Sequence, residues 1–149
     1  MVQYTAAPEF CYRPWRMEKL PLRIAVVDDD ESVRKALKRL LRASNLDAKT
    51  FESGGDFLAS LASYQPDCVI LDLHMPGMNG LDVQRQLTRN GVPLPVVIIT
   101  GHDEPQTRAQ CLAAGATAYM CKPLDEEVLL DAIRRAIGIR AHESAESQK

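Results

Sequence analysis

The chain has 149 residues, a length that favours a single domain. Apolar residues make up 46% and charged residues 26%, the usual mix of a globular protein, which excludes collagen, a coiled coil or disorder as the whole structure. Eighteen basic and twenty acidic residues leave a net charge of −2, so we do not expect this chain to bind nucleic acid directly. No apolar run reaches the ~20 residues of a membrane helix, so we do not expect a membrane partner.

Residues 1–21 show no hydrophobic period and hold aromatic residues, prolines and mixed charges. They predict an irregular N-terminal extension. The alternative is an ordered arm that packs Tyr12 or Trp15 on the domain.

Two features indicate the compartment. A basic start followed by an apolar stretch, the layout of a signal peptide, is missing from the first residues. The four cysteines, at positions 11, 68, 111 and 121, include no close pair of the zinc-knuckle kind, which favours reduced thiols. We therefore expect a cytoplasmic protein.

Strand-like and helix-like segments alternate between residues 22 and 138. The predicted strands are residues 22–27, 47–51, 68–73, 95–100 and 117–121. The predicted helices are residues 32–43, 53–61, 81–89, 104–114 and 125–137, followed by a polar, frayed tail at 139–149. Because the strands are apolar throughout, the sheet should be covered on both faces. The alternation predicts a doubly wound α/β domain with a five-stranded parallel sheet and helices on both faces.

The helix predicted at 32–43 shows the expected two faces. Val33, Leu37, Leu40 and Leu41 recur at helical spacing, and Arg34 belongs to the basic residues of the opposite face. The pattern predicts an amphipathic helix.

Polar side chains stand at the carboxyl ends of four predicted strands, where sites lie in such sheets. They are Asp28, Asp29 and Asp30 after the first strand, Asp72 at the third, Thr100 at the fourth and Lys122 at the fifth. An Asp-Asp pair by itself is often only a helix cap, but the whole set favours a site. Close carboxylates need a cation or protons to reduce their repulsion, and Mg²⁺ suits such oxygen ligands together with a phosphate. The set predicts phosphoryl transfer to a carboxylate.

Four stretches carry a resemblance to a known family: IAVVDDDESVRKAL, CVILDLHMPGMNGLDV, PVVIITGHDE and GATAYMCKPLDEEVL. In order and spacing they resemble the receiver domain of response regulators, the CheY-like family with a flavodoxin-like fold, over about residues 22–138. The resemblance implies that Asp72 is the phosphoacceptor. It also implies that Mg²⁺ is held by Asp28, Asp29, Asp72 and the backbone carbonyl of His74.

The resemblance further implies a switch. Thr100 is then the switch hydroxyl, Lys122 the characteristic lysine of the family, and Tyr119 the aromatic switch residue. The bond between Lys122 and Pro123 is expected to be cis. The output surface would comprise the fourth helix, fifth strand and fifth helix, which would bind a downstream protein target or a second copy of the chain.

The function implied is that of a two-component phosphorelay response regulator, either stand-alone or cut from a longer protein. It would take a phosphoryl group from a histidine kinase or a histidine phosphotransfer protein. Although it would promote its own phosphorylation and dephosphorylation, it would act mainly as a signalling switch. One alternative is an Asp-based hydrolase of the haloacid-dehalogenase type, but Asp72-Leu73-His74 lacks the second carboxylate of a D-x-D motif. The other is a receiver that binds proteins without phosphorylation.

Overall fold

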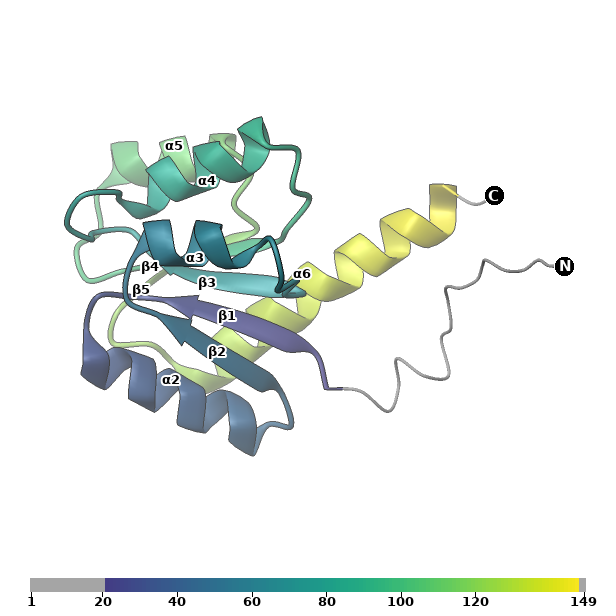
Figure 1. Cartoon of the computed structure of the whole chain (residues 1–149), viewed down its shortest axis with the longest axis horizontal. Helices are drawn as coiled ribbons and strands as arrows, with labels where there is room; N and C mark the ends of the chain where they lie inside the picture. Colours follow the sequence, from purple (N-terminus) through teal and green to yellow (C-terminus); the bar gives the residue numbers. More distant parts are fainter. Residues whose placement is uncertain (1–20, 148–149) are drawn as a thin grey trace, which may run out of the picture.

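The computed structural model describes residues 21–147, so the predicted N-terminal extension lies almost wholly outside the described residues (Figure 1). Five parallel strands form one sheet in the order β2-β1-β3-β4-β5. The strands are β1 (Arg23–Val27), β2 (Asp47–Phe51), β3 (Cys68–Asp72), β4 (Val96–Thr100) and β5 (Ala118–Cys121). The prediction of a doubly wound α/β domain is confirmed.

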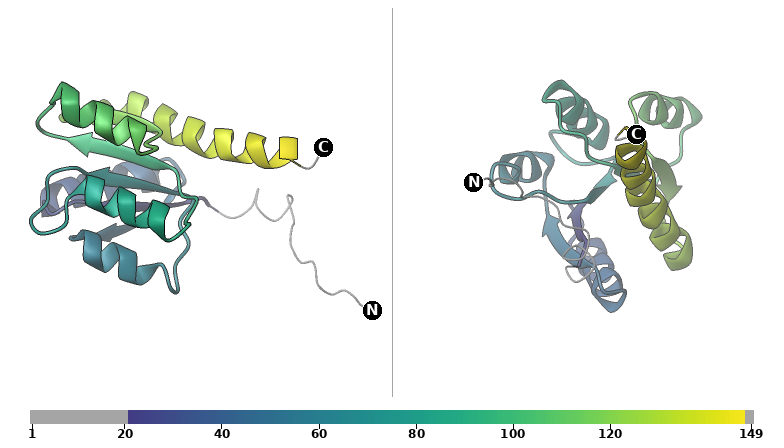
Figure 2. Two further views of the ribbon diagram at one scale, coloured as in Figure 1. Left: turned by 90° about the horizontal axis from the view of Figure 1, so that it is seen from above. Right: turned by 90° about the vertical axis from the view of Figure 1, so that its right-hand side faces the viewer.

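Five helices connect and follow the strands. They are α2 (Glu31–Ala43), α3 (Gly54–Ser60), α4 (Gly80–Arg89), α5 (Pro105–Ala113) and α6 (Glu126–Ser147). Figures 1 and 2 show α3, α4 and α5 on one face of the sheet and α2 and α6 on the other. Among the helices of the described residues, none is both long and apolar enough to cross a membrane.

The core has two halves because alternate residues of each strand point to opposite faces. In β1, Ala25 and Val27 pack toward α3, α4 and α5, while Ile24 and Val26 pack toward α2 and α6. All four side chains have no exposed surface. This burial on both sides explains why the strand sequences are apolar without alternation.

The last helix is longer than predicted. Its end was placed at Ile137, before Gly138, but α6 continues to Ser147 and extends beyond the sheet (Figure 1). A glycine inside a helix costs only about 1 kcal/mol relative to alanine, and no proline follows to stop the helix. The prediction that the last helix ends at Ile137 was therefore wrong.

Close packing joins the start of α4 to the end of β3. A Cβ atom on Gly80 would lie 2.6 Å from the backbone oxygen of Asp72, and the Gly80 N–H donates to the Leu73 carbonyl at 2.9 Å. Asn79 and Asp82 form a capping box that begins the helix at this point. The contact holds the loop after β3 against the sheet edge.

Candidate functional site

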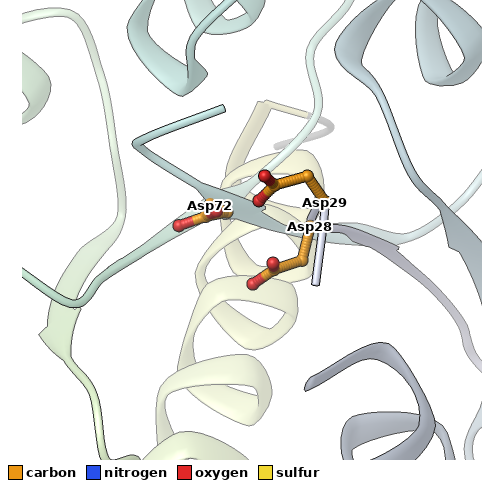
Figure 3. Close-up of side chains that lie close together, drawn as sticks. All are labelled: Asp28, Asp29 and Asp72. Carbon is orange, nitrogen blue, oxygen red and sulfur yellow. The ribbon is translucent and has the colours of Figure 1, made fainter. Parts of the chain in front are cut away.

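Three aspartates meet at the carboxyl edge of the sheet (Figure 3). Asp28 follows β1 and Asp72 ends β3, and these two strands are neighbours in the sheet. One carboxylate oxygen from each of Asp28, Asp29 and Asp72 lies within 4.8 Å of the others. Asp28 has no exposed surface and Asp72 is 3% exposed, whereas Asp29 is exposed. The cluster therefore has two buried members and one that faces solvent.

Lys122 brings a positive charge to the two buried carboxylates. Its Nζ donates to Asp28 Oδ2 at 2.9 Å and to Asp72 Oδ1 at 3.4 Å, across 94 and 50 residues of sequence. Burial by itself lowers the pKa of Lys122, but the hydrogen bond to Asp28 and the charges of both carboxylates outweigh it, so the pKa is raised. Lys122 is therefore charged and shared between the two aspartates.

Asp72 is held in an environment that disfavours its ionised form. Burial, followed by the negative charge of Asp28, raises its pKa from 3.8 to about 6, although Lys122 acts in the opposite direction. One ammonium group therefore does not fully compensate the cluster. Three carboxylates converge here, and the exposed Asp29 lets the cluster face solvent on one side. A hard divalent cation, which prefers oxygen ligands, fits this donor set.

Thr100 ends β4 and is fully buried. Its Oγ1 donates to the carbonyl of His102 and accepts from the N–H of His102, both at 3.1 Å. The Lys122 N–H donates to the Thr100 carbonyl at 2.7 Å, and the bond between Lys122 and Pro123 is cis, as the resemblance implied. Thr100 is thus linked both to the loop before α5 and to Lys122, the cation of the cluster.

Tyr119 lies on the same face of the sheet as Thr100. It pairs with Ile98, two residues before Thr100, and it belongs to the core half under α5. Tyr119 is 9% exposed, and its buried hydroxyl has no hydrogen-bond partner among the described residues. The Arg108 guanidinium lies 5.5 Å from the ring centroid. Burial raises the pKa of the Tyr119 hydroxyl.

His74 and His102 follow Asp72 and Thr100 by two residues each. Both side chains are exposed, and their rings meet edge-on with centroids 6.3 Å apart. Within the part of the chain that the structure describes, neither histidine side chain belongs to the cluster of Asp28, Asp29 and Asp72.

A family model described as the response regulator receiver domain matches residues 24–134. The chain belongs to this family. The prediction from the sequence motifs is confirmed, and the domain is a receiver of the two-component response-regulator class.

Individual relatives agree with this assignment. The response regulator protein TmoT of Ectopseudomonas mendocina is 42% identical over 114 residues, which are 76% of this chain and 52% of TmoT. TodT of Pseudomonas putida strain F1 is 41% identical over 114 residues, 76% of this chain and 50% of TodT. A crystal structure of a response regulator receiver protein from Burkholderia phymatum has 46% identity and a TM-score of 0.71, covering 78% of this chain and 95% of that one. The chain thus spans about half the length of the curated relatives it matches.

Receivers of this family generally bind Mg²⁺ in an acidic pocket and pair with histidine kinases, and this receiver has a cluster of three aspartates at the edge of its sheet. Sequence reasoning missed one residue beside it. Arg34, assigned to the basic face of its helix, has a side chain only 16% exposed and donates to the backbone oxygen of Asp28 at 2.8 Å. Its charge at the sixth position after Asp28 was the only available signal.

Proposed function

We propose that Asp72 of this receiver accepts a phosphoryl group from a phosphohistidine donor, and that the modification switches a protein-interaction surface. The observation that carries the proposal is the contact of Lys122 with Asp72 and Asp28 at the carboxyl edge of the sheet. It joins a buried nucleophile to a cation that can bind an incoming phosphoryl oxygen.

Asp72 acts as the nucleophile in this scheme. One of its carboxylate oxygens bonds to phosphorus while the phosphorus–nitrogen bond to the donor histidine breaks, and the released imidazole takes a proton from water. With a pKa of about 6, Asp72 is mostly ionised at neutral pH. Lys122 is already within hydrogen-bond reach of the carboxylate and needs little movement to contact a phosphoryl oxygen. Water later hydrolyses the acyl phosphate and restores the carboxylate.

Asp28, Asp29, Asp72 and the backbone carbonyl of His74 would hold Mg²⁺. The ion would reduce the negative charge of the phosphoryl group as the carboxylate approaches. The support for this site is the convergence of the three carboxylates within 4.8 Å.

Thr100 begins the switch. To donate to a phosphoryl oxygen, its hydroxyl must leave the carbonyl of His102, which frees the loop before α5. Tyr119 lies on the same face of the sheet, beside Ile98 and two residues from Thr100 in register, so a movement of Thr100 can be followed by the Tyr119 ring. A local charge change thereby biases α5, β5 and α6, the surface proposed for output. Two large apolar side chains of these helices are exposed: Leu112 on α5 is 45% exposed and Val128 on α6 is 54% exposed.

The proposed donor is a histidine kinase or a histidine phosphotransfer protein. An open groove of about 220 Å³ runs beside the site between α2 and the residues after β5, and Val33, Leu37 and Leu40 are among its lining residues. An apolar face of a donor helix would fit this groove and bring its phosphohistidine to Asp72. The proposed compartment is the cytoplasm, because Cys68 and Cys111 are buried free thiols.

Incubation with acetyl phosphate and Mg²⁺, followed by intact-protein mass spectrometry, tests the acceptor. The wild type should gain one phosphoryl group, and Asp72→Asn should gain none. Asp131→Asn on the exposed side of α6 is the matched control and should behave as the wild type. Equal phosphorylation of Asp72→Asn and the wild type would refute the assignment of the acceptor.

Beryllofluoride with Mg²⁺, a phosphoryl mimic, tests the switch. It should change self-association or partner affinity by a coupling of about 1–3 kcal/mol, measured by sedimentation or partner titration. Tyr119→Ala should weaken this coupling while Asp72 is still phosphorylated. Identical association with and without the mimic would favour a receiver that only stores phosphoryl groups.

A further inference from the structure

Arg34 reaches from α2 back to the end of β1. Its Nη1 donates to the backbone oxygen of Asp28 at 2.8 Å, and its side chain is 16% exposed. An arginine on a solvated helix face normally extends into water. This one instead binds the backbone of a residue in the acidic cluster.

The bound carbonyl belongs to the peptide that joins Asp28 to Asp29. Because a peptide group is planar, holding the Asp28 oxygen also orients the N–H of Asp29 and sets the direction in which its backbone leaves. The rest of Asp28 is held independently. Its N–H donates to the Phe51 carbonyl at 3.1 Å, its Oδ1 accepts from the Asp30 N–H at 2.9 Å, and its Oδ2 accepts from Lys122.

Asp29 has no such support of its own. It is exposed, and no hydrogen bond within residues 21–147 reaches its carboxylate. Its position in the cluster is therefore determined by the backbone on which it stands. Among the side chains that the structure describes, Arg34 is the one that holds the peptide immediately before it.

Arg34 also faces Glu52 in the segment after β2. Their nearest atoms are 4.0 Å apart, and the Glu52 side chain is 72% exposed. An exposed ion pair at this distance contributes little. The bond to the Asp28 carbonyl is therefore the contact that matters, and Glu52 provides a matched control.

We propose that Arg34 is a positioning residue that holds the Asp28–Asp29 peptide and thereby sets the affinity of the acidic cluster for Mg²⁺. The inference rests on the proposed function of this cluster. For a variant without Arg34, the proposal and a purely electrostatic argument predict opposite changes in Mg²⁺ affinity. Removing a cation makes the site more negative and should tighten Mg²⁺ binding, whereas losing the peptide orientation should weaken it.

The test uses Arg34→Met, Arg34→Lys and Glu52→Gln, each titrated with Mg²⁺ at constant ionic strength and followed by melting temperature. Arg34→Met should raise the Mg²⁺ concentration at half-maximal stabilisation by about 10-fold or more, as is usual when a residue that orients a metal ligand is lost. Arg34→Lys retains an N–H donor and should recover part of the affinity. Glu52→Gln should leave the midpoint unchanged.

The other outcomes are distinct. A lower melting temperature of Arg34→Met with an unchanged Mg²⁺ midpoint would show a purely structural role and overturn the proposal. A tighter midpoint would show that charge outweighs position and would also overturn it. Acetyl phosphate uptake by the wild type is measured in parallel, so that a failure of the proposed function is seen separately from a failure of the Arg34 inference.

Discussion

Replacing Asp72 with asparagine should stabilise the domain when no Mg²⁺ is present. Asp72 is 3% exposed, and burial together with the charge of Asp28 raises its pKa from 3.8 to about 6. Since one pKa unit corresponds to about 1.4 kcal/mol, ionised Asp72 destabilises the folded state by about 3 kcal/mol at neutral pH. Asparagine has the same shape and no charge to bury. Its amide oxygen can still accept from Lys122, although the bond to a charged carboxylate is lost.

The net gain is therefore about 2–3 kcal/mol in the free energy of unfolding. For a domain of this size, a change of 1 kcal/mol moves the melting temperature by about 3–5 °C, so the rise should be about 10 °C. The gain must depend on pH. Because the pKa of Asp72 is higher in the folded than in the unfolded chain, the destabilisation is complete above about pH 6 and is relieved as the pH falls toward 3.8. At pH 5 about half of the difference between the variants should remain.

Urea unfolding of the wild type and Asp72→Asn in EDTA, at pH 7 and pH 5, measures this difference. Asp131→Asn, which removes an exposed carboxylate, controls for net charge. Saturating Mg²⁺ should narrow the gap, because the wild type gains more from the ion than a variant with one carboxylate fewer. A gap of zero at pH 7, or one equal at both pH values, would refute the reasoning that Asp72 is destabilised by its own ionisation.

Three further outcomes follow from the packing and charge of the site. Lys122→Met should lower the free energy of unfolding in EDTA by about 3–5 kcal/mol, because it leaves two buried carboxylates without their cation. It should also slow phosphorylation by acetyl phosphate, and a rate equal to that of the wild type would exclude Lys122 from the reaction. Gly80→Ala should destabilise the domain by about 1–3 kcal/mol in urea unfolding, since the added Cβ would lie 2.6 Å from a backbone oxygen. A Cβ added at Gly55 would meet no atom within 4 Å, so Gly55→Ala should not show this loss, and equal effects of the two variants would refute the close approach at Gly80. Cys121 is exposed and should be alkylated by iodoacetamide in the folded protein. Cys68 is buried, which raises the pKa of its thiol to about 12, so it should react only after unfolding. Peptide mapping that finds both cysteines equally labelled in the folded protein would contradict the burial of Cys68.

The sequence alone determined the architecture and the membership of the main cluster. Strands that are apolar throughout, alternating with amphipathic helices, require a parallel sheet covered on both faces. In such a sheet all carboxyl ends lie at one edge, so residues at strand ends converge whatever their separation in the chain. Asp28, Asp72 and Lys122 were predicted together for this reason, and the structure places Lys122 within 3.4 Å of both carboxylates.

Only the tertiary structure decided the energetics of that cluster. A sequence shows that Asp72 ends an apolar strand, but the rise of its pKa to about 6 depends on burial and on the placement of Asp28 and Lys122. The reciprocal bonds between Thr100 and His102 likewise depend on how the chain turns after β4. Hydrogen bonds of this kind are decided over a few tenths of an ångström, which residue patterns do not encode.

Two features of the structure were not predicted from the sequence, and their physical reasons differ. Helical periodicity assigns Arg34 to the basic face of α2 but does not show what that face contacts, and in the structure Arg34 meets the backbone of Asp28 after β1. A glycine is a local stop signal of modest strength, and at Gly138 the helix continues to Ser147. Periodicity and propensity are local and weak signals. The contact of Arg34 comes from a segment whose position the assembled sheet determines, whereas the penalty of one glycine at position 138 is too small to end the helix.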